Sequence, residues 1–268
     1  MNGSWIARYW PLAALVLAVA ALAAFGGAGP LPDFTRRLMP PSVDAPFGTD
    51  ALGRDMLARS LAGLSLSLRI GLAASLASTA IALCLTMVAS LHRAAGGLVS
   101  FVTDAVLSLP HLVLLVLIAF ALGGGADAVV AAVALSHWPR LTRLLRLELE
   151  QLLASDFVAA SRAFGRSPLH VAARHVLPHL LPQLAVGAVL MLPHAILHEA
   201  ALTFLGFGLE PTRPAIGILL SEAMRTLSAG YWWLGLFPGL VLVATVLLVE
   251  SIGTHLRRRL TPLPEAAR

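Results

Sequence analysis

The chain has 268 residues, of which 58% are hydrophobic and only 12% are charged, and its mean hydropathy is +0.83. A composition this apolar excludes an ordinary soluble domain and indicates a membrane protein. The sequence contains 19 arginines and no lysine, which excludes a standard P-loop because that motif needs a lysine to reach the nucleotide phosphates. Any ATP-driven work must therefore be powered by another chain. A single cysteine, Cys84, excludes an internal disulfide and a thiol metal cluster.

Six segments approach the roughly 20 apolar residues that a membrane-spanning helix needs. We expect them at about residues 9–25, 70–91, 98–122, 128–138, 180–205 and 232–253. A cleaved signal peptide is the alternative for the first segment, because residues 21–23, "ALA", resemble a cleavage site. The fourth is short, and we count it because it must return the chain to the side that carries most arginines. The prediction is an all-α transmembrane fold with six spans.

Arginines gather between the fourth and fifth spans and again after the sixth, as "HLRRRL". The positive-inside rule places both groups in the cytoplasm, together with both termini. We therefore expect four parts along the chain: a first transmembrane helix with a short cytoplasmic N-terminus (1–26), an external loop with an amphipathic segment (27–69), a core domain (70–254) with a cytoplasmic loop (140–179), and a cytoplasmic tail (255–268).

The external loop contains the string "GTDALGRD". We expect Asp50 to cap a short amphipathic helix that leads into the second span, with Arg54 and Asp55 as charges on its surface. A solvated run of charges without a partner is the alternative. The residues singled out here are Gly48, Thr49, Asp50, Gly53, Arg54 and Asp55.

The cytoplasmic loop contains "SDFVAASRAFGRSPLHVAARHVLPHLLPQL". This string predicts a helix, a break at Gly165, a short helix that opens at Ser167 and Pro168, and a stop at Pro178. Apolar residues such as Phe157 and Phe164 interrupt its arginines, and exposed apolar side chains on a surface helix fit a groove in a partner. A hairpin that only links two spans is the alternative.

The fifth span ends in "PHAILHEAALTFLGFG". His194 and His198 are four residues apart and share a helix face, while Glu199 lies about 100° further round. The pair is open to three interpretations: catalytic, structural, or part of a substrate path. The catalytic one is weak, since "HEAAL" lacks the second histidine of a zinc-protease motif. Asp104 and His111 in the third span, seven residues apart, are expected on one face and are candidates for the same path.

Several of these strings resemble bacterial ABC importer permeases. "AASRAFG", followed after nine residues by "HVLP", is similar to their EAA loop, which docks onto the ATPase subunit. "FGTDALGRDMLARSLAG", "LTFLGFGLEP" and "LFPGL" resemble signatures of the dipeptide, oligopeptide and nickel permeases. The resemblance assigns the ATPase-coupling role to Phe157, Ala159, Ala160, Ser161, Phe164, Gly165, Leu177 and Pro178.

This resemblance implies a non-catalytic subunit with the type I importer permease fold in the bacterial inner membrane. It also implies three kinds of partner: a second permease, two ATP-binding subunits and an external substrate-binding protein. The chain itself would bind no cofactor, and ATP and magnesium would be used by the partner subunits.

The two histidines before the "FLG" string, together with "ALSHW" at residues 134–138, resemble the C-type subunit of nickel permeases. We therefore expect transport of nickel or a metal chelate, with His194 and His198 as transient ligands and Glu199, Asp104 and His111 along the path. A peptide importer is one alternative. An ATP-independent channel or secondary transporter is another.

Overall fold

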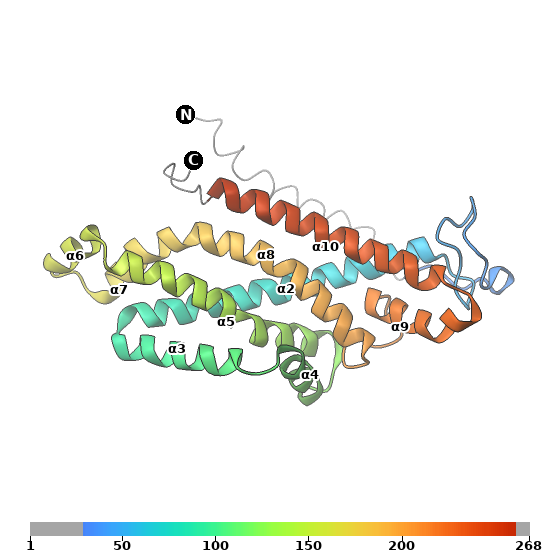
Figure 1. Ribbon diagram of the computed structural model, residues 1–268, viewed down its shortest axis with the longest axis horizontal. Helices are drawn as coiled ribbons and strands as arrows, with labels where there is room; N and C mark the ends of the chain where they lie inside the picture. Colours follow the sequence, from blue (N-terminus) through green and yellow to red (C-terminus); the bar gives the residue numbers. More distant parts are fainter. Residues whose placement is uncertain (1–28, 261–268) are drawn as a thin grey trace.

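The computed structural model describes residues 29–260; the predicted first span (1–26) and the residues from 261 onward lie outside this range. The regular secondary structure of these residues is helical, apart from one isolated bridge between Thr49 and Asp55. Most of the longer helices run nearly along one long axis (Figure 1). Their bounds are η1 Phe34–Arg36, α2 Met56–Leu91, α3 Arg93–Leu107, α4 His111–Ala121, α5 Gly125–Leu153, α6 Asp156–Ala163, α7 Pro168–Val171, η2 Ala172–Val176, α8 Leu177–Phe204, α9 Ile216–Thr226, η3 Leu227–Ala229 and α10 Trp233–Leu260.

Helix α2 lies at the centre and packs against both α5 and α8. It begins where Asp55 accepts a hydrogen bond from the Ala58 amide at 2.8 Å, and it continues for 36 residues. Its buried face is rich in alanine, serine and glycine, which lets neighbouring backbones approach closely. A Cβ atom on Gly71 would lie 2.8 Å from Ile196 Cγ1 on α8. The second span is thus confirmed, although it starts before the predicted residue 70.

The predicted third span is not one straight helix. Its two parts, α3 and α4, meet at an angle of 94°. The chain leaves the helix at Ser108 and resumes at His111, because a proline at position 110 has no amide hydrogen and disfavours a helical residue before it. Asp104 and His111 therefore lie on two different helices, and the expectation that they share one face was wrong.

The number of spans also differs from the prediction. Within residues 29–260, three helical segments are long and apolar enough to cross a membrane, or four if the bent pair α3–α4 counts as one. Helix α5 is not among them, since it joins an apolar first half to a second half that contains three arginines. It does extend far beyond the predicted 128–138, because Pro139 is accommodated inside the helix. Six spans are not confirmed.

Helix α8 confirms the fifth predicted span, but the predicted stop at Pro178 was wrong. Helix α7, a single wide turn (η2) and α8 form one helical segment, Pro168–Phe204. Pro178 follows directly on the π-helical turn η2, and this wider turn accommodates the change in hydrogen bonding at a residue without an amide hydrogen. The chain can therefore continue without a break into the membrane-spanning part.

Helix α8 ends at the glycines of "FLGFG". Gly206 has φ +87°, and its amide donates to Thr203 O while the Phe207 amide donates to Leu202 O. These two bonds form a Schellman motif. Gly208 then lies against Thr203, whose Cα atom would be 2.5 Å from an added Cβ. Gly206 thus ends the helix, and Gly208 packs closely against its last turn.

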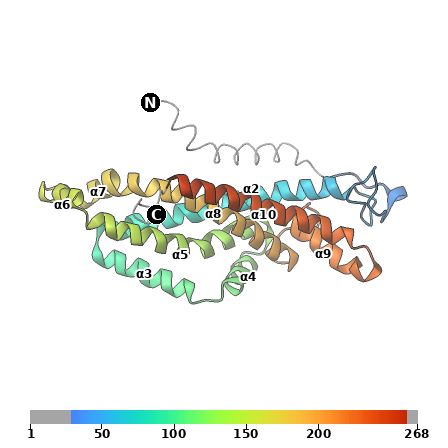
Figure 2. The same cartoon turned by 45° about the horizontal axis from the view of Figure 1, so that its top comes forward.

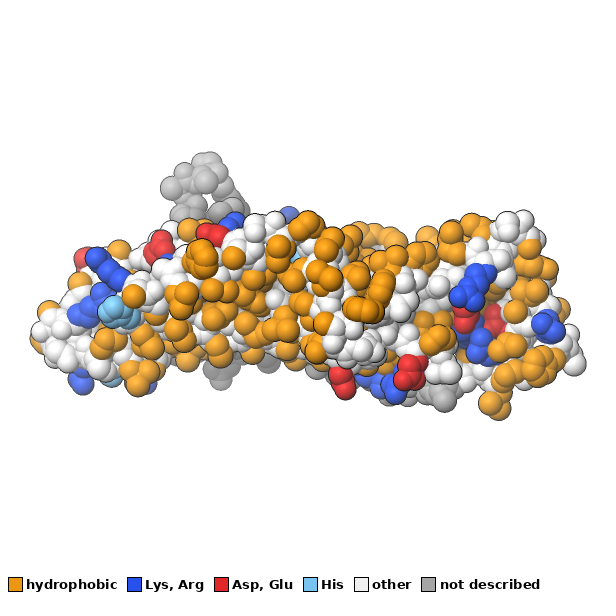
Figure 3. All heavy atoms as spheres, turned by 90° about the horizontal axis from the view of Figure 1, so that it is seen from below, with side chains coloured by type: hydrophobic (Ala, Val, Ile, Leu, Met, Phe, Trp, Pro, Cys, Tyr) orange, Lys and Arg blue, Asp and Glu red, His pale blue; other side chains and the backbone are white. Residues whose placement is uncertain are grey.

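The two ends of the molecule have different structures. Helices α6 and α7 project at one end, and the loops of residues 29–55 and helix α9 lie at the other, with α10 beside α8 (Figures 1 and 2). Hydrophobic side chains dominate the face shown in Figure 3, and charged groups lie mainly toward its two ends and along its edges. This distribution is typical of a helical bundle surrounded by lipid.

Candidate functional site

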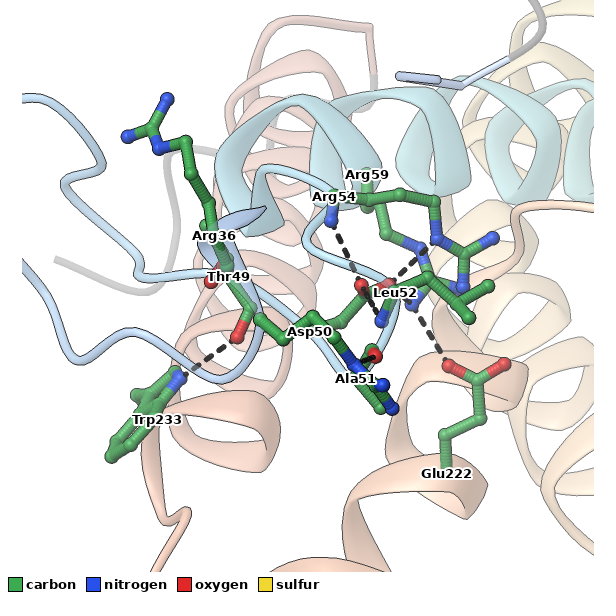
Figure 4. Close-up of polar contacts among 10 residues, drawn as sticks. Arg36, Thr49, Asp50, Ala51, Leu52, Arg54, Arg59, Glu222 and Trp233 are labelled. Atoms are coloured by element: carbon green, nitrogen blue, oxygen red, sulfur yellow. Dashed lines mark hydrogen bonds and ion pairs between the residues drawn. The ribbon is translucent and has the colours of Figure 1, made fainter. Parts of the chain in front are cut away.

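Three regions contain the residues singled out in the sequence: a turn at the α9 end, the α6–α7 hairpin at the opposite end, and a histidine cluster between α4, α5 and α8. The first is organised by the carboxylate of Asp50 (Figure 4). Its Oδ1 accepts from the amides of Leu52 and Arg54 at 2.8 and 2.9 Å. Its Oδ2 lies 2.7 Å from Arg54 Nε and 2.6 Å from Arg59 Nη1. Asp50 thus folds the turn onto the start of α2.

The prediction that Asp50 caps a helix was wrong. Asp55 is the residue that caps α2, and Asp50 instead stabilises a compact turn by accepting bonds two and four residues ahead. Within residues 29–55 the helical content is limited to η1, so the predicted amphipathic helix is absent from this described part.

At η1, the hydroxyl and amide of Thr35 donate to Asp33 and hold the pKa of that carboxyl below its usual range.

The other residues of "GTDALGRD" hold the turn against its neighbours. Thr49 accepts a bond from the Met39 amide and donates to Arg36 O, while its own carbonyl accepts from Trp233 Nε1 at 3.3 Å. Gly53 has φ +76°, and a Cβ there would lie 1.7 Å from Asp33 O. Gly48 likewise has positive φ and faces Trp233. The string is therefore a folded structural unit at the start of α2 and α10.

The α6–α7 hairpin has the predicted break at Gly165. This residue has φ +76°, and the amides of Gly165 and Arg166 donate to Arg162 O and Ser161 O, which forms a second Schellman motif. Ser167 then caps α7 by accepting from the His170 amide at 3.2 Å, and Pro168 is the first helical residue. The predicted helix–break–helix arrangement is confirmed here.

Apolar side chains of this hairpin point away from the protein. Phe164 is 84% exposed and Leu169 is 69% exposed, while Phe157 stacks on the ring of His179 with 5.4 Å between centroids. Ser161 Oγ lies 3.2 Å from His175 Nε2, which ties α6 to η2. Of the remaining predicted coupling residues, Ala159 and Ala160 are exposed on α6, whereas Leu177 and Pro178 begin α8. The hairpin is thus a rigid projection with an uncovered apolar tip.

The third region brings three histidines together, each from a different helix. His111 is the first residue of α4, His137 lies in α5 and His198 in α8. The centroids of their rings are 4.6 to 4.9 Å apart in all three pairs. One ring nitrogen from each lies within 4.8 Å of the other two. This arrangement is chemically suited to binding a transition-metal ion.

The structure therefore changes the set of residues expected along the path. His198 and His111 are brought together, but His194 is exposed and lies outside the cluster. Glu199 is fully buried, where its Oε1 accepts from Thr203 Oγ1 at 3.0 Å. Asp104 forms an exposed ion pair with Arg143 on the flank of α3 and α5. The sequence did not assign His137 to the path. Its position in "ALSHW" was the only signal, because no spacing rule relates residues on three helices.

Comparison with solved structures defines the class of this protein. The chain is similar to a subunit of the MetNI methionine ABC transporter in an inward-facing conformation, with a TM-score of 0.61 and 20% identity over 77% of this chain and 98% of that chain. An identity this low shows the fold alone. The protein is thus an all-helical membrane protein with the fold of type I ABC importer permeases.

Sequence comparison then places the chain in its family. Residues 78–262 match the family described as binding-protein-dependent transport system inner membrane component. A putative peptide transport system permease protein of Brucella suis biovar 1 is 35% identical over 84% of this chain and 76% of the relative. The di/tripeptide transport system permease protein DppC of Pseudomonas aeruginosa is 38% identical over 81% of this chain and 71% of the relative. The chain belongs to this family of ABC importer permeases.

Membership in this family decides several of the expectations drawn from the sequence. The chain is a non-catalytic, multi-pass subunit of the inner membrane, and its family works with ATPase and substrate-binding-protein partners. It is therefore neither an ATP-independent channel nor a secondary transporter. Nickel specificity finds no support in the relatives named above, whose names refer to peptides.

Proposed function

We propose that this chain is one of the two permease subunits of an importer for short peptides. The observation that carries the proposal is the match to permeases named for peptide or di/tripeptide transport at 35% and 38% identity, over more than four fifths of this chain. In this proposal a peptide delivered by an external binding protein passes between this chain and a second permease. Two ATP-binding subunits supply the energy, with ATP and magnesium bound to them.

The α6–α7 hairpin is the proposed contact with an ATP-binding subunit. It projects from one end of the bundle, and the exposed ring of Phe164 and side chain of Leu169 are suited to an apolar groove in a partner (Figure 1). It is also continuous with α8 through η2, so a displacement of α7 is passed to a membrane helix without an intervening loop. This supports alternating access driven by closure of the ATP-binding subunits, with the hairpin and both termini on the cytoplasmic side.

The turn around Asp50 lies at the opposite end and is the proposed external surface. Its compact hydrogen bonding, and its link to α9 through Arg59 of α2, give the binding protein a preformed surface rather than a flexible loop. The affinity for peptide would reside mainly in the binding protein, and this chain would provide a path of low affinity.

Uptake of a radiolabelled dipeptide tests the proposal. The complete complex is expressed in cells that lack their own peptide and nickel importers, and a complex whose ATP-binding subunits have lost their P-loop lysine is the control for energised uptake. We expect accumulation of the dipeptide with the intact complex alone. Absence of peptide uptake, with the complex assembled in the membrane, would refute the proposal.

A second candidate substrate is nickel or a metal chelate, because His111, His137 and His198 converge in the membrane-embedded part. The same cells are therefore given radioactive nickel, with and without a histidine chelator. Accumulation of nickel without accumulation of peptide would assign the complex to metal uptake. Accumulation of peptide alone would leave the histidines with a role other than substrate transport.

A further inference from the structure

The histidine cluster of His111, His137 and His198 has a defined hydrogen-bonding pattern. His137 Nδ1 lies 2.9 Å from Val133 O, and His198 Nδ1 lies 2.7 Å from His194 O. A carbonyl oxygen only accepts hydrogen bonds, so each Nδ1 must carry the proton and donate it. In a neutral imidazole the proton on Nδ1 leaves the lone pair on Nε2. Two rings thus have a fixed tautomer whose free Nε2 atom is a metal-ligand atom.

The third ring supplies an unpartnered polar atom. His111 Nε2 is buried and has no hydrogen-bond partner among the residues that the structure describes. Burial of a polar nitrogen without a partner is unfavourable, and native structures contain few such atoms. Simple packing of three imidazoles therefore leaves this atom unexplained, whereas coordination of an ion would satisfy it.

The distances are compatible with one ion. A zinc ion binds imidazole nitrogens at about 2.0 to 2.1 Å, which corresponds to roughly 3.3 Å between ligand nitrogens in a tetrahedron. One ring nitrogen of each histidine lies within 4.8 Å of those of the other two, so binding of one ion requires the rings to move closer together by rotation. The backbone carbonyls that hold Nδ1 of His137 and His198 are the outer-shell partners typical of metal-bound histidines.

We infer that His111, His137 and His198 form a binding site for one divalent transition-metal ion, of the class of zinc, nickel and copper, that joins α4 to α5 and α8. Imidazole is a preferred ligand of these ions, and a set of three without carboxylates disfavours magnesium and calcium. Three protein ligands leave a fourth position for water or an exogenous ligand. The inference goes beyond peptide import and does not depend on it.

The position of the site gives it a structural consequence. His111 is the first residue after the 94° bend between α3 and α4. Helix α4 contacts α5 extensively but has few contacts with α8. An ion shared by the three helices would therefore fasten the start of α4 to the bundle and hold the bend in place. Bound metal is expected to raise the thermal stability of the permease.

The test uses the complete complex, purified without a polyhistidine tag, and Co²⁺ as the spectroscopic probe. We compare wild type with His111→Ala, His137→Ala and His198→Ala. His194→Ala is the matched control, because His194 is a histidine of the same helix α8 but lies outside the cluster. We expect one tightly bound Co²⁺ per permease with tetrahedral absorption. Each cluster substitution should weaken binding at least about 100-fold, the upper range for loss of even an outer-shell partner, and His194→Ala should leave it unchanged.

Two results would overturn the site: a wild-type complex that binds no stoichiometric Co²⁺, or binding that survives the cluster substitutions. Should the alanine variants fail to assemble, His198→Cys is tested instead, because it retains a metal ligand at this position and reports whether the ion binds there. A charge-transfer band from a cobalt–thiolate bond in this variant supports the site, and its absence contradicts it. Peptide uptake is not a readout here, so failure of the metal site is distinguishable from failure of the transport proposal.

Discussion

Arg59 of α2 and Glu222 of α9 form an ion pair across 163 residues of sequence, with 2.8 Å between Nη1 and Oε2. The same Nη1 also contacts Asp50 Oδ2 at 2.6 Å. The side chains of Arg59 and Asp50 are only 5% and 6% exposed, whereas that of Glu222 is 43% exposed. One buried arginine thus connects the first turn, the longest helix and α9 (Figure 4).

We predict that Asp50→Asn destabilises the permease strongly. It leaves the buried guanidinium of Arg59 without its nearer carboxylate, and removing one partner of a buried ion pair typically costs about 3 to 5 kcal/mol. The measurement is thermal unfolding of the purified complex in detergent. Asp104→Asn is the control, since the Asp104–Arg143 pair is exposed and should contribute less than about 1 kcal/mol. Equal effects of the two substitutions would show that the Asp50 network is not a major source of stability.

We predict that Gly53→Ala disrupts the turn through a steric clash in addition to backbone strain. An added Cβ would lie 1.7 Å from Asp33 O, at a residue with φ +76°. Gly123→Ala is the control, because its φ is +83° but an added Cβ meets nothing within 4 Å. The control should lose only the roughly 1 to 2 kcal/mol of left-handed strain. Limited proteolysis of residues 29–55 is the measurement, and similar resistance of the two variants would contradict the prediction.

We predict that Gly217→Ala separates α9 from α8. A Cβ at this position would lie 2.4 Å from Ala200 O and 2.8 Å from Thr203 Cβ, and backbone atoms cannot move aside as a flexible side chain can. Overpacking of this kind costs about 1 to 3 kcal/mol. Gly239→Ala in α10 is the control, since its nearest neighbour would be Leu220 Cδ2 at 3.9 Å. Thermal unfolding of both variants measures the difference in their stability. Equal stability of the two variants would show that α9 and α8 are loosely packed and would contradict the prediction.

We predict that Phe164→Ala weakens association with the ATP-binding subunit while the permease itself stays folded. The ring is 84% exposed, so its removal leaves no cavity in this chain. Phe34→Ala is the control, because Phe34 is 65% exposed and belongs to η1, outside the hairpin. Co-purification of the ATP-binding subunit with each variant is the measurement. Retention of full association by Phe164→Ala would exclude this ring from the contact.

The sequence predicted local features well where a single residue type determines the backbone. Gly165 and Gly206 end helices in the positions expected of glycine, and Ser167 and Pro168 start α7 as their chemistry requires. Each of these signals acts within about six residues. The presence of an apolar helical fold was likewise evident from composition, because lipid requires backbone hydrogen bonds to be made within the segment.

The prolines were harder to interpret, because the effect of a proline depends on its surroundings. Pro110 stands at a 94° bend, Pro139 lies inside α5, and Pro178 lies in the first turn of α8. Each lacks an amide hydrogen, but the helix continues through the proline at two of the three positions, and at Pro178 a π-helical turn precedes it. Hydropathy gives no information on which outcome applies.

The histidine cluster was predicted only in part, since it is a contact between distant parts of the chain. His194 and His198 share a face by spacing, but the packing of α8 turns His198 toward α4 and α5 while His194 stays exposed. The relation between His111, His137 and His198 depends on the bend before α4. A periodicity argument on one helix cannot contain that information.

The uninterrupted segment Pro168–Phe204 also gives the molecule a mechanical property. At a rise of 1.5 Å per residue, the distance along the axis from Pro168 to His198 is about 45 Å. A displacement applied to α7 therefore acts on the same helical segment that carries His198. The π-helical turn η2 and the prolines inside α8 are the points at which this segment bends, so they set how much of the displacement reaches His198.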